Sequence, residues 1–209
     1  MNKIFLFVIL LFSNLATTQA IDVQGRVAYF IPQNHNIRSF YAKGLPEYEV
    51  EVSAPMNSFS CLNTCDENWT AWTNFSIYQK KGHDSCQQYS SKITNWALNF
   101  GAKRYISGCM PCAFDNLRPY LGFGIGFAHL KLKNHSCYDC YDNDHHGKYG
   151  FALLAKFGFE YQITCNLFLD FFADYSANWI KSDRSNDCIS SHCHNTGGLK
   201  LGAGLGYRF

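Results

Sequence analysis

The side chains with the most reactive chemistry in this sequence are cysteines and histidines that gather in short stretches. The stretch CYDCYDNDHH contains Cys137 and Cys140, followed by His145 and His146. Thiolate and imidazole at short spacing are the ligands that tetrahedral zinc prefers. This stretch lacks the second C-x-x-C that would complete a strong zinc signature. We therefore expect no metal and no other cofactor, and keep a metal- or ligand-binding surface receptor or adhesin as the alternative.

Oxidation is the other chemistry open to the ten cysteines. The N-terminal stretch MNKIFLFVILLFSNLATTQA has one basic residue, an apolar centre and a small-residue end, which predicts a cleaved secretory signal peptide over residues 1–20. Cysteines of an exported chain form disulfides by default. The predicted disulfide candidates, whose connectivity the sequence leaves open, are Cys61, Cys65, Cys109, Cys112, Cys137, Cys140, Cys188 and Cys193.

No set of residues with the pattern of a catalytic site appears. The histidines occur largely near cysteines, and no G-x-S-x-G motif accompanies them. Losing Lys3 with the signal peptide leaves 17 of the 18 basic side chains against 16 acidic ones. This balance argues against a nucleic-acid partner. The sequence predicts a protein that is not an enzyme.

These residues must be positioned by β-strands, because apolar and polar residues alternate with a period of two. Eight stretches show the pattern: VQGRVAYFI, PEYEVEVSA, AWTNFSIYQ, TNWALNFGAK, YLGFGIGFAHLK, KYGFALLAKFGFEY, NLFLDFFADYSANW and the C-terminal GLKLGAGLGYRF. Aromatic residues make up 17% of the chain, yet its mean hydropathy is slightly negative. This combination is typical of strands that face lipid on one side and a polar interior on the other.

The predicted fold is all-β: a closed eight-stranded antiparallel transmembrane β-barrel over residues 21–209, with a lumen filled by side chains. A secreted β-sandwich would show similar alternation, and the sequons at Asn68, Asn74 and Asn134 would suit it. The run from Phe151 to Tyr161 favours the barrel, because its apolar face would leave a sandwich no polar exterior.

Charged residues fall on the face that alternation assigns to the lumen. Their signs are mixed on neighbouring strands, and unpaired charges in a low-dielectric interior are costly, so we expect a closed polar network and no continuous conduction. The predicted members are Arg26, Glu49, Glu51, Lys103, Lys156, Glu160, Asp170, Asp174, Lys200 and Arg208.

If both termini are periplasmic, the connections alternate between the two sides of the membrane. The predicted outer loops are 33–44, 80–91, 133–147 and 181–196, and the predicted inner turns are 56–69, 105–117 and 164–165. Five cysteines then lie on each side. Because five is odd, one thiol on each side stays without a disulfide partner. The predicted unpaired cysteines are Cys86 outside and Cys165 inside.

The terminal GLGYRF, the RPYLGFGIGF stretch and the count of eight strands resemble the outer-membrane β-barrel superfamily of the OmpA and OmpX type. This resemblance covers nearly all of the chain after residue 20. It implies a bacterial outer-membrane location, lipid as the surroundings, and recognition of the C-terminal aromatic strand, with Tyr207 and Phe209, by the barrel assembly machinery. The LPEYEVEV and LFLDFFADYS stretches and the cysteine content are similar to small barrels of chlamydia-like bacteria.

Cysteine-rich envelope proteins of such bacteria cross-link their outer membranes, so this second resemblance implies disulfide-linked envelope proteins as partners. The sequence thus leads to the hypothesis of a structural, surface-exposed barrel, stabilised by disulfides and tied to its neighbours through odd cysteines. A diffusion pore is disfavoured, since a barrel of eight strands is only wide enough for side chains to fill.

Overall fold

The computed structural model describes residues 21–35, 37–38, 44–56, 68–83, 89–106, 116–136, 145–180 and 194–209. The candidate signal peptide at 1–20 lies outside these residues, as do parts of the predicted connections. Among the described residues no helix is long and apolar enough to cross a membrane.

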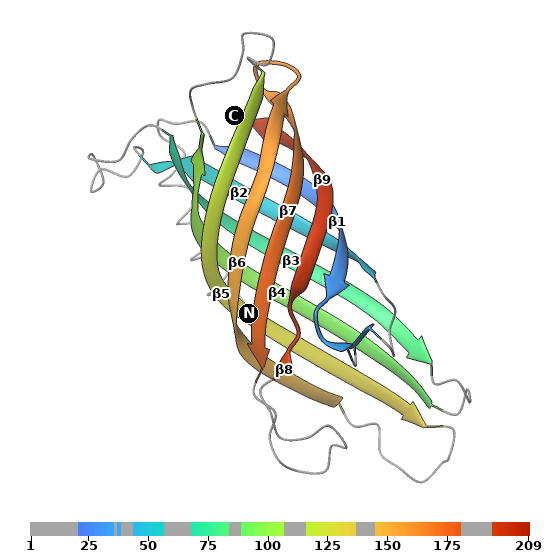
Figure 1. Cartoon of the computed structure of the whole chain (residues 1–209). Coiled ribbons are helices and arrows are strands. Elements are labelled where there is room, and N and C mark those ends of the chain that lie inside the picture. Colours follow the sequence, from blue (N-terminus) through green and yellow to red (C-terminus); the bar gives the residue numbers. More distant parts are fainter. Residues whose placement is uncertain are drawn as a thin grey trace, which may run out of the picture.

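Eight long strands form one antiparallel sheet, and a ninth strand of two residues lies at its rim (Figure 1). The elements are β1 (Asp22–Pro32), β2 (Leu45–Pro55), β3 (Trp69–His83), β4 (Tyr89–Tyr105), β5 (Leu117–Ser136), β6 (His145–Gln162), β7 (Leu167–Ile180), β8 (His194–Asn195) and β9 (Gly198–Arg208).

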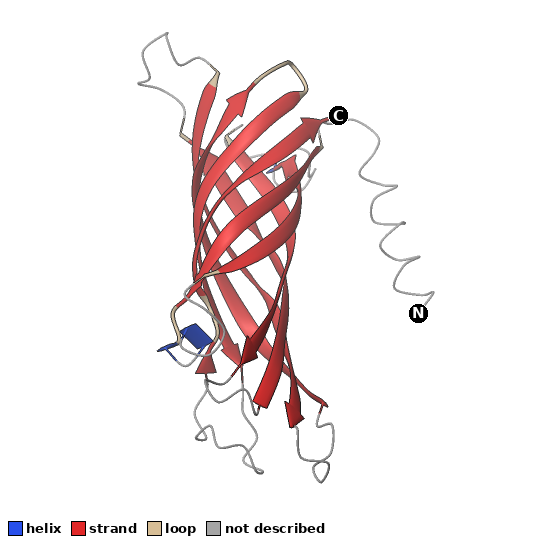
Figure 2. Cartoon of the chain, turned by 90° about the vertical axis from the view of Figure 1, so that its right-hand side faces the viewer, coloured by secondary structure: helices blue, strands red, loops and turns tan. Residues whose placement is uncertain are grey.

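The sheet closes on itself. Each strand from β1 to β7 pairs with the next, β7 also pairs with β9, and β9 pairs back with β1 over its whole length. Figure 2 shows the resulting tilted strands around a closed wall. The eight-stranded antiparallel barrel that the alternation predicts is therefore confirmed.

Several strands are longer than the sequence pattern indicated. β3 continues to His83 and β5 to Ser136, so the predicted loops 80–91 and 133–147 are partly strand. β4 and β6 likewise begin at Tyr89 and His145. The sequence of these extensions is polar at consecutive positions, as at Lys80 and Lys81. A strand that leaves the apolar region no longer needs alternation, so the pattern stops before the hydrogen-bonded ladder does.

The barrel has two different rims. One rim carries the C-terminus and the turn 163–166 between β6 and β7, slightly longer than the predicted 164–165; we call it the turn rim. The other carries the end of β1, β8 and the ends of β3 to β6; we call it the loop rim. Alternate residues of every strand point into the lumen, as in β2, where glutamates are buried and Tyr48 and Val50 are exposed.

Candidate functional site

Arg26 is the centre of the lumen. It projects from β1 and its side chain is fully buried. Its Nη1 atom lies 3.0 Å from Glu49 Oε2 and 3.3 Å from Glu51 Oε2, both on β2. Two strands away in the sheet, beyond β9, its Nε atom lies 3.1 Å from Asp170 Oδ2 and its Nη2 atom 3.0 Å from Asp174 Oδ2, both on β7.

The contacts of Arg26 differ in quality. Nη1 donates hydrogen bonds to the two glutamates, whereas Nε and Nη2 lie within ion-pair distance of the aspartates without making a hydrogen bond. The guanidinium carbon also sits 3.4 Å from the ring centroid of Phe172, a cation–π contact. One cation therefore joins two strands, β2 and β7, that are not neighbours in the sheet.

Two lysines extend the network toward the turn rim. Lys156 on β6 pairs with Glu51 and lies 3.9 Å from Asp174 Oδ2, and its Nζ atom is 4.6 Å from the ring of Trp72. Lys103 on β4 lies 3.4 Å from Glu51 Oε1 and 3.0 Å from Glu160 Oε1. Glu51 is thus shared by three cations, which compensates for its complete burial.

Tyrosine hydroxyls and an amide complete the polar layer. Tyr105 donates to Glu160 at 2.6 Å, and Tyr120 donates to Asp170 at 2.8 Å. Asn74 Nδ2 donates to Glu49 at 3.1 Å. These neutral donors supply hydrogen bonds to buried carboxylates, which an ion pair alone leaves partly unsatisfied.

Toward the loop rim, Lys200 on β9 closes the network. Its Nζ atom lies 2.7 Å from Glu47 Oε1 and 2.8 Å from Glu49 Oε1. In this fully buried set, four cations (Arg26, Lys103, Lys156 and Lys200) face six carboxylates (Glu47, Glu49, Glu51, Glu160, Asp170 and Asp174), a formal excess of two negative charges.

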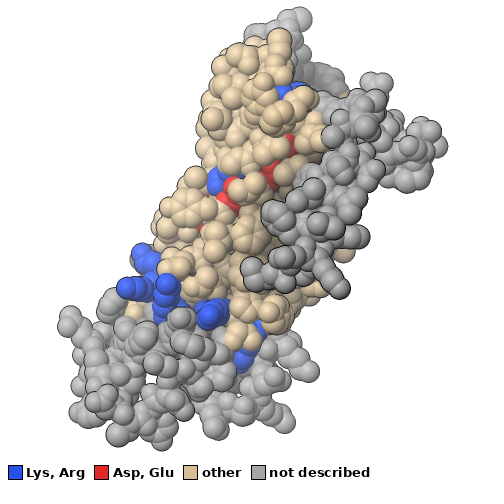
Figure 3. All heavy atoms as spheres, turned by 180° about the vertical axis from the view of Figure 1, so that it is seen from behind, with Lys and Arg blue, Asp and Glu red and all other residues tan. Residues whose placement is uncertain are grey.

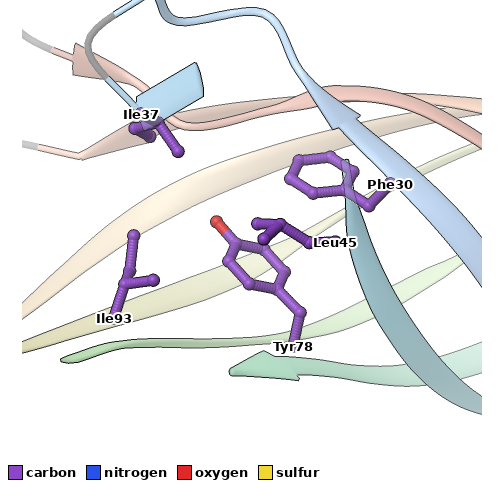
Figure 4. Close-up of a cluster of buried hydrophobic side chains, with 5 residues drawn as sticks. All are labelled: Phe30, Ile37, Leu45, Tyr78 and Ile93. Carbon is purple, nitrogen blue, oxygen red and sulfur yellow. The ribbon is translucent and has the colours of Figure 1, made fainter. Parts of the chain in front are cut away.

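An apolar plug caps this polar layer at the loop rim. It consists of Phe30, Ile37, Leu45, Tyr78 and Ile93, with Leu130 packed against it (Figure 4). The rings of Phe30 and Tyr78 stack with centroids 4.9 Å apart. Ile37 comes from the segment after β1 rather than from a strand, and Figure 4 shows it directed at the cluster from beyond the strands. The plug fills the lumen on the side of the barrel where the strands run longest.

The turn rim ends in a separate ion pair. Arg208 on β9 holds Asp22 on β1 through two hydrogen bonds, of 2.7 Å and 2.8 Å, and its guanidinium lies 5.7 Å from the ring of Phe168. Arg118 lies 4.2 Å over the ring of Tyr105. Arg208 is partly exposed there, so it belongs to the mouth of the barrel and not to the central network.

Glycines make room for the large side chains in this narrow lumen. A Cβ atom on Gly206 would lie 2.1 Å from the Phe168 ring, and one on Gly202 would lie 2.6 Å from the Phe172 ring. Gly202 and Gly206 thus leave room for aromatic rings of β7, the neighbour of β9 in the sheet, whereas a Cβ atom on Gly204 would lie 2.8 Å from the side chain of Arg26.

The outer wall is the second notable surface, because its large apolar side chains are exposed. On β6 they run from Tyr149 to Tyr161, which are 71% and 44% exposed, and include Phe151, Leu153, Phe157 and Phe159. Twelve residue steps of a strand tilted by about 40° rise about 31 Å along the barrel axis. The hydrocarbon core of a bilayer is about 30 Å thick. The wall matches a membrane in height and in chemistry.

Nine of the ten predicted lumen residues lie together in the central network, and Arg208 lies at the turn rim. The sequence list omitted Glu47 and Asp22, although both have the alternation phase of listed residues on their own strands. It also omitted Asn74, Tyr105 and Tyr120 as hydrogen-bond donors. Alternation places these side chains inside, but only the register of the strands brings each to its carboxylate.

Most of the cysteines and metal-ligand candidates predicted from the sequence lie outside the described residues. Cys165 is the one cysteine among the described residues; it is exposed and free in the turn between β6 and β7. The eight disulfide candidates and Cys86 lie outside the described residues, and so do Cys137 and Cys140 of the metal prediction. His145 and His146 begin β6, but their side chains are not described. These predictions remain predictions.

A filled lumen inside an apolar wall defines a class: the small, closed β-barrels with the fold of outer-membrane proteins. No family model matches the sequence, and neither does any curated protein.

Among solved structures, the chain is similar to Neisserial surface protein A (NspA), with a TM-score of 0.59 and 14% sequence identity over 92% of this chain and 100% of that one. It is also similar to Ail, the attachment invasion locus protein of Yersinia pestis, with a TM-score of 0.55 and 13% identity over 92% of this chain and 100% of that one. At these identities the likeness shows the fold, which agrees with the predicted class.

Proposed function

We propose that this protein is a structural, surface-exposed barrel of a bacterial outer membrane, and that it is neither an enzyme nor a channel. The observation that carries the proposal is the arrangement of charge and apolar area. Tyr149 to Tyr161 cover the thickness of a bilayer on the outside, while Arg26 and its partners fill the inside. Lipid is the surrounding that suits such a wall.

Tryptophan quenching by lipids with brominated acyl chains tests the membrane embedding. Trp179 is on the outer wall and 41% exposed, whereas Trp72 is in the lumen and 3% exposed. Two variants would each keep one of these residues and replace the other three of the four tryptophans with phenylalanine. After refolding into brominated vesicles, emission of the Trp179 variant should be strongly quenched and that of the Trp72 variant much less.

The Trp72 variant is the matched control, because it has the same fold and differs in the face on which its indole lies. Equal quenching of the two variants, or protection of Trp179, would contradict a wall that faces lipid. A soluble barrel of the same shape would give that result.

The C-terminal residues fit the proposed assembly in a cell. Tyr207 and Phe209 are exposed on the outer wall, with ring centroids 4.9 Å apart. We propose that they form the signal read by the barrel assembly machinery. Phe209→Ala should lower the fraction of folded barrel in outer membranes while leaving refolding in vesicles unchanged. Leu205→Ala, on the same face of β9, is the control and should change neither.

Cross-linking to neighbours is the finer part of the proposal. The exposed free thiol of Cys165 supports it. Outer membranes isolated without reductant should give reducible bands of higher mass, and the double variant Cys165→Ser with Cys86→Ser should lose them. If the double variant still forms these bands, or the natural protein never forms them, the cross-linking role is wrong.

A further inference from the structure

Charge is divided sharply between the two faces of the described wall. Every described Asp and Glu is buried: Asp22, Glu47, Glu49, Glu51, Glu160, Asp170 and Asp174. Among the strand side chains that the structure describes, the charged ones on the outward phase are all basic, namely Lys81, Lys92, Lys131 and Arg104. Figure 3 shows basic side chains gathered toward the lower end of the face in view.

Three of these residues are close together at the loop rim. Lys81 on β3 stands directly opposite Lys92 on β4, and Lys92 stands opposite Lys133 on β5. Lys131 is two residues before Lys133, on the same strand. Like charges directly opposite each other destabilise an antiparallel pair. No carboxylate of the described residues pairs with Lys81, Lys92 or Lys131, so these three residues, which we call the lysine patch, present a net positive charge on the outer wall.

An aromatic row lies directly below the lysine patch and marks its depth. Trp96, His129 and Tyr149 occupy one register position on β4, β5 and β6. The ring centroids of Trp96 and His129 are 5.2 Å apart, and those of His129 and Tyr149 are 4.5 Å apart. Amphipathic aromatic rings collect where the hydrocarbon of a bilayer meets its headgroups.

The spacing along the strands places the lysine patch among lipid headgroups. Lys131 is two residues beyond His129, and Lys92 is four residues beyond Trp96. In strands tilted by about 40° these steps rise about 5 Å and about 10 Å along the barrel axis. Each headgroup layer is roughly 5 to 8 Å thick, and a lysine stem can lie along the wall while its ammonium group reaches phosphate depth.

We propose that the lysine patch binds phosphate groups of anionic lipid headgroups in the leaflet at the loop rim. The inference rests on the proposed membrane location and adds to it a lipid preference on one sector of the barrel, β3 to β5. A lipid is the occupant that the position favours, because the anion must sit immediately above the aromatic row. An ammonium group is a suitable point charge for phosphate.

Spin-labelled lipids test the preference. The natural protein is refolded into phosphatidylcholine vesicles with a trace of spin-labelled phosphatidic acid or, in parallel, spin-labelled phosphatidylcholine, and the motionally restricted fraction is measured by electron paramagnetic resonance. Phosphatidic acid should be enriched about fivefold at the barrel, the factor expected for one lysine contact at a charged surface. In the triple variant Lys81→Gln, Lys92→Gln, Lys131→Gln the enrichment should fall close to one.

Two controls separate position from charge. The triple arginine variant of the same positions should keep the enrichment. Arg38→Gln removes an exposed cation that lies outside strands β3 to β5, in the segment after β1, and should keep it as well. Quenching of Trp179 by brominated lipid, measured on the variant that keeps Trp179 as its single tryptophan, reports embedding independently of lipid preference.

The outcomes are distinct. If Trp179 is quenched but the natural protein shows no enrichment of phosphatidic acid, the lipid site is wrong and the membrane location still holds. The same conclusion follows if the triple glutamine variant shows the same enrichment as the natural protein. Unquenched Trp179 overturns both proposals. A third outcome is that dextran sulfate binds the natural protein in phosphatidylcholine vesicles but not the triple glutamine variant, while phosphatidic acid is not enriched. In that case a soluble polyanion is the ligand and the lipid proposal is wrong.

Discussion

Replacing Arg26 with methionine should strongly destabilise the barrel, because four buried carboxylates contact this one guanidinium. Three of them keep another cation: Glu49 contacts Lys200, Glu51 contacts Lys103 and Lys156, and Asp174 lies near Lys156. Asp170 keeps the hydrogen bond from Tyr120, but no other cation of the described residues lies within ion-pair distance of it. The variant therefore leaves essentially one uncompensated buried carboxylate.

That count sets the magnitude. Breaking one buried ion pair by removing a partner costs about 3 to 5 kcal/mol, so the free energy of unfolding should fall by about 4 kcal/mol. With a urea dependence of about 2.5 kcal/mol/M, the midpoint should drop by roughly 1.6 M. Asp170→Asn alone should cost about 1 kcal/mol or less, because Arg26 retains three carboxylates and the lumen already has a formal excess of negative charge.

The double variant Arg26→Met with Asp170→Asn tests whether Asp170 is the carboxylate that loses its cation. It should be more stable than Arg26→Met alone, since the second substitution removes the carboxylate that the first leaves without a cation. Urea unfolding in lipid vesicles, followed by tryptophan fluorescence, gives all three midpoints. A cost below about 1 kcal/mol for Arg26→Met, or a double variant less stable than Arg26→Met, would refute the assignment of Arg26 as the centre of the network.

Three further predictions concern packing, conduction and closure. Gly206→Ala places a methyl group against the Phe168 ring and should cost about 1 to 3 kcal/mol, partly recovered by adding Phe168→Leu, whereas Gly25→Ala, which meets nothing within 4 Å, should be neutral in the same urea assay. In planar bilayers the filled lumen should give no large, steady single-channel current; such currents would contradict a closed network. The unboiled protein should migrate faster than the boiled one in SDS gels, because a closed ladder has no free edge from which to unravel, and identical migration would count against the barrel.

Alternation predicted which face of each strand lies inside, and it did so without any knowledge of the pairing. Arg26 and Glu51 could both be placed in the lumen because each follows the phase of its own strand. The contact between them depends on the register of β1 with β2, and the contact between Arg26 and Asp174 depends on how the whole sheet closes. Register comes from interactions far apart in the chain, so the sequence pattern gives membership of the network but not its partners.

The features that alternation missed lie where the period of two carries no information. The ends of β3 and β5 beyond the apolar wall are polar on both faces, and so their length was underestimated. Ile37 lies outside any strand, so nothing in the pattern could place it in the plug. Asp22 and Glu47 lie near strand ends, where inclusion in the lumen depends on how far the strand reaches.

The charge distribution also indicates where this fold obtains its stability. Lipid tails are as apolar as the side chains of the wall, so packing Phe151 or Phe159 against them adds little hydrophobic driving force beyond insertion itself. The terms that fix one strand arrangement must then come from the backbone ladder and from the lumen. Arg26 links β1 to both β2 and β7, and Lys103 and Lys156 link β2 to β4 and β6. A buried ion network usually adds little net stability, but it penalises every register in which one of its charges is left alone. Glycine-rich strands such as β9 specify their register only weakly by packing, so such a penalty selects the correct register. The lumen charges therefore specify the register more than they strengthen the barrel.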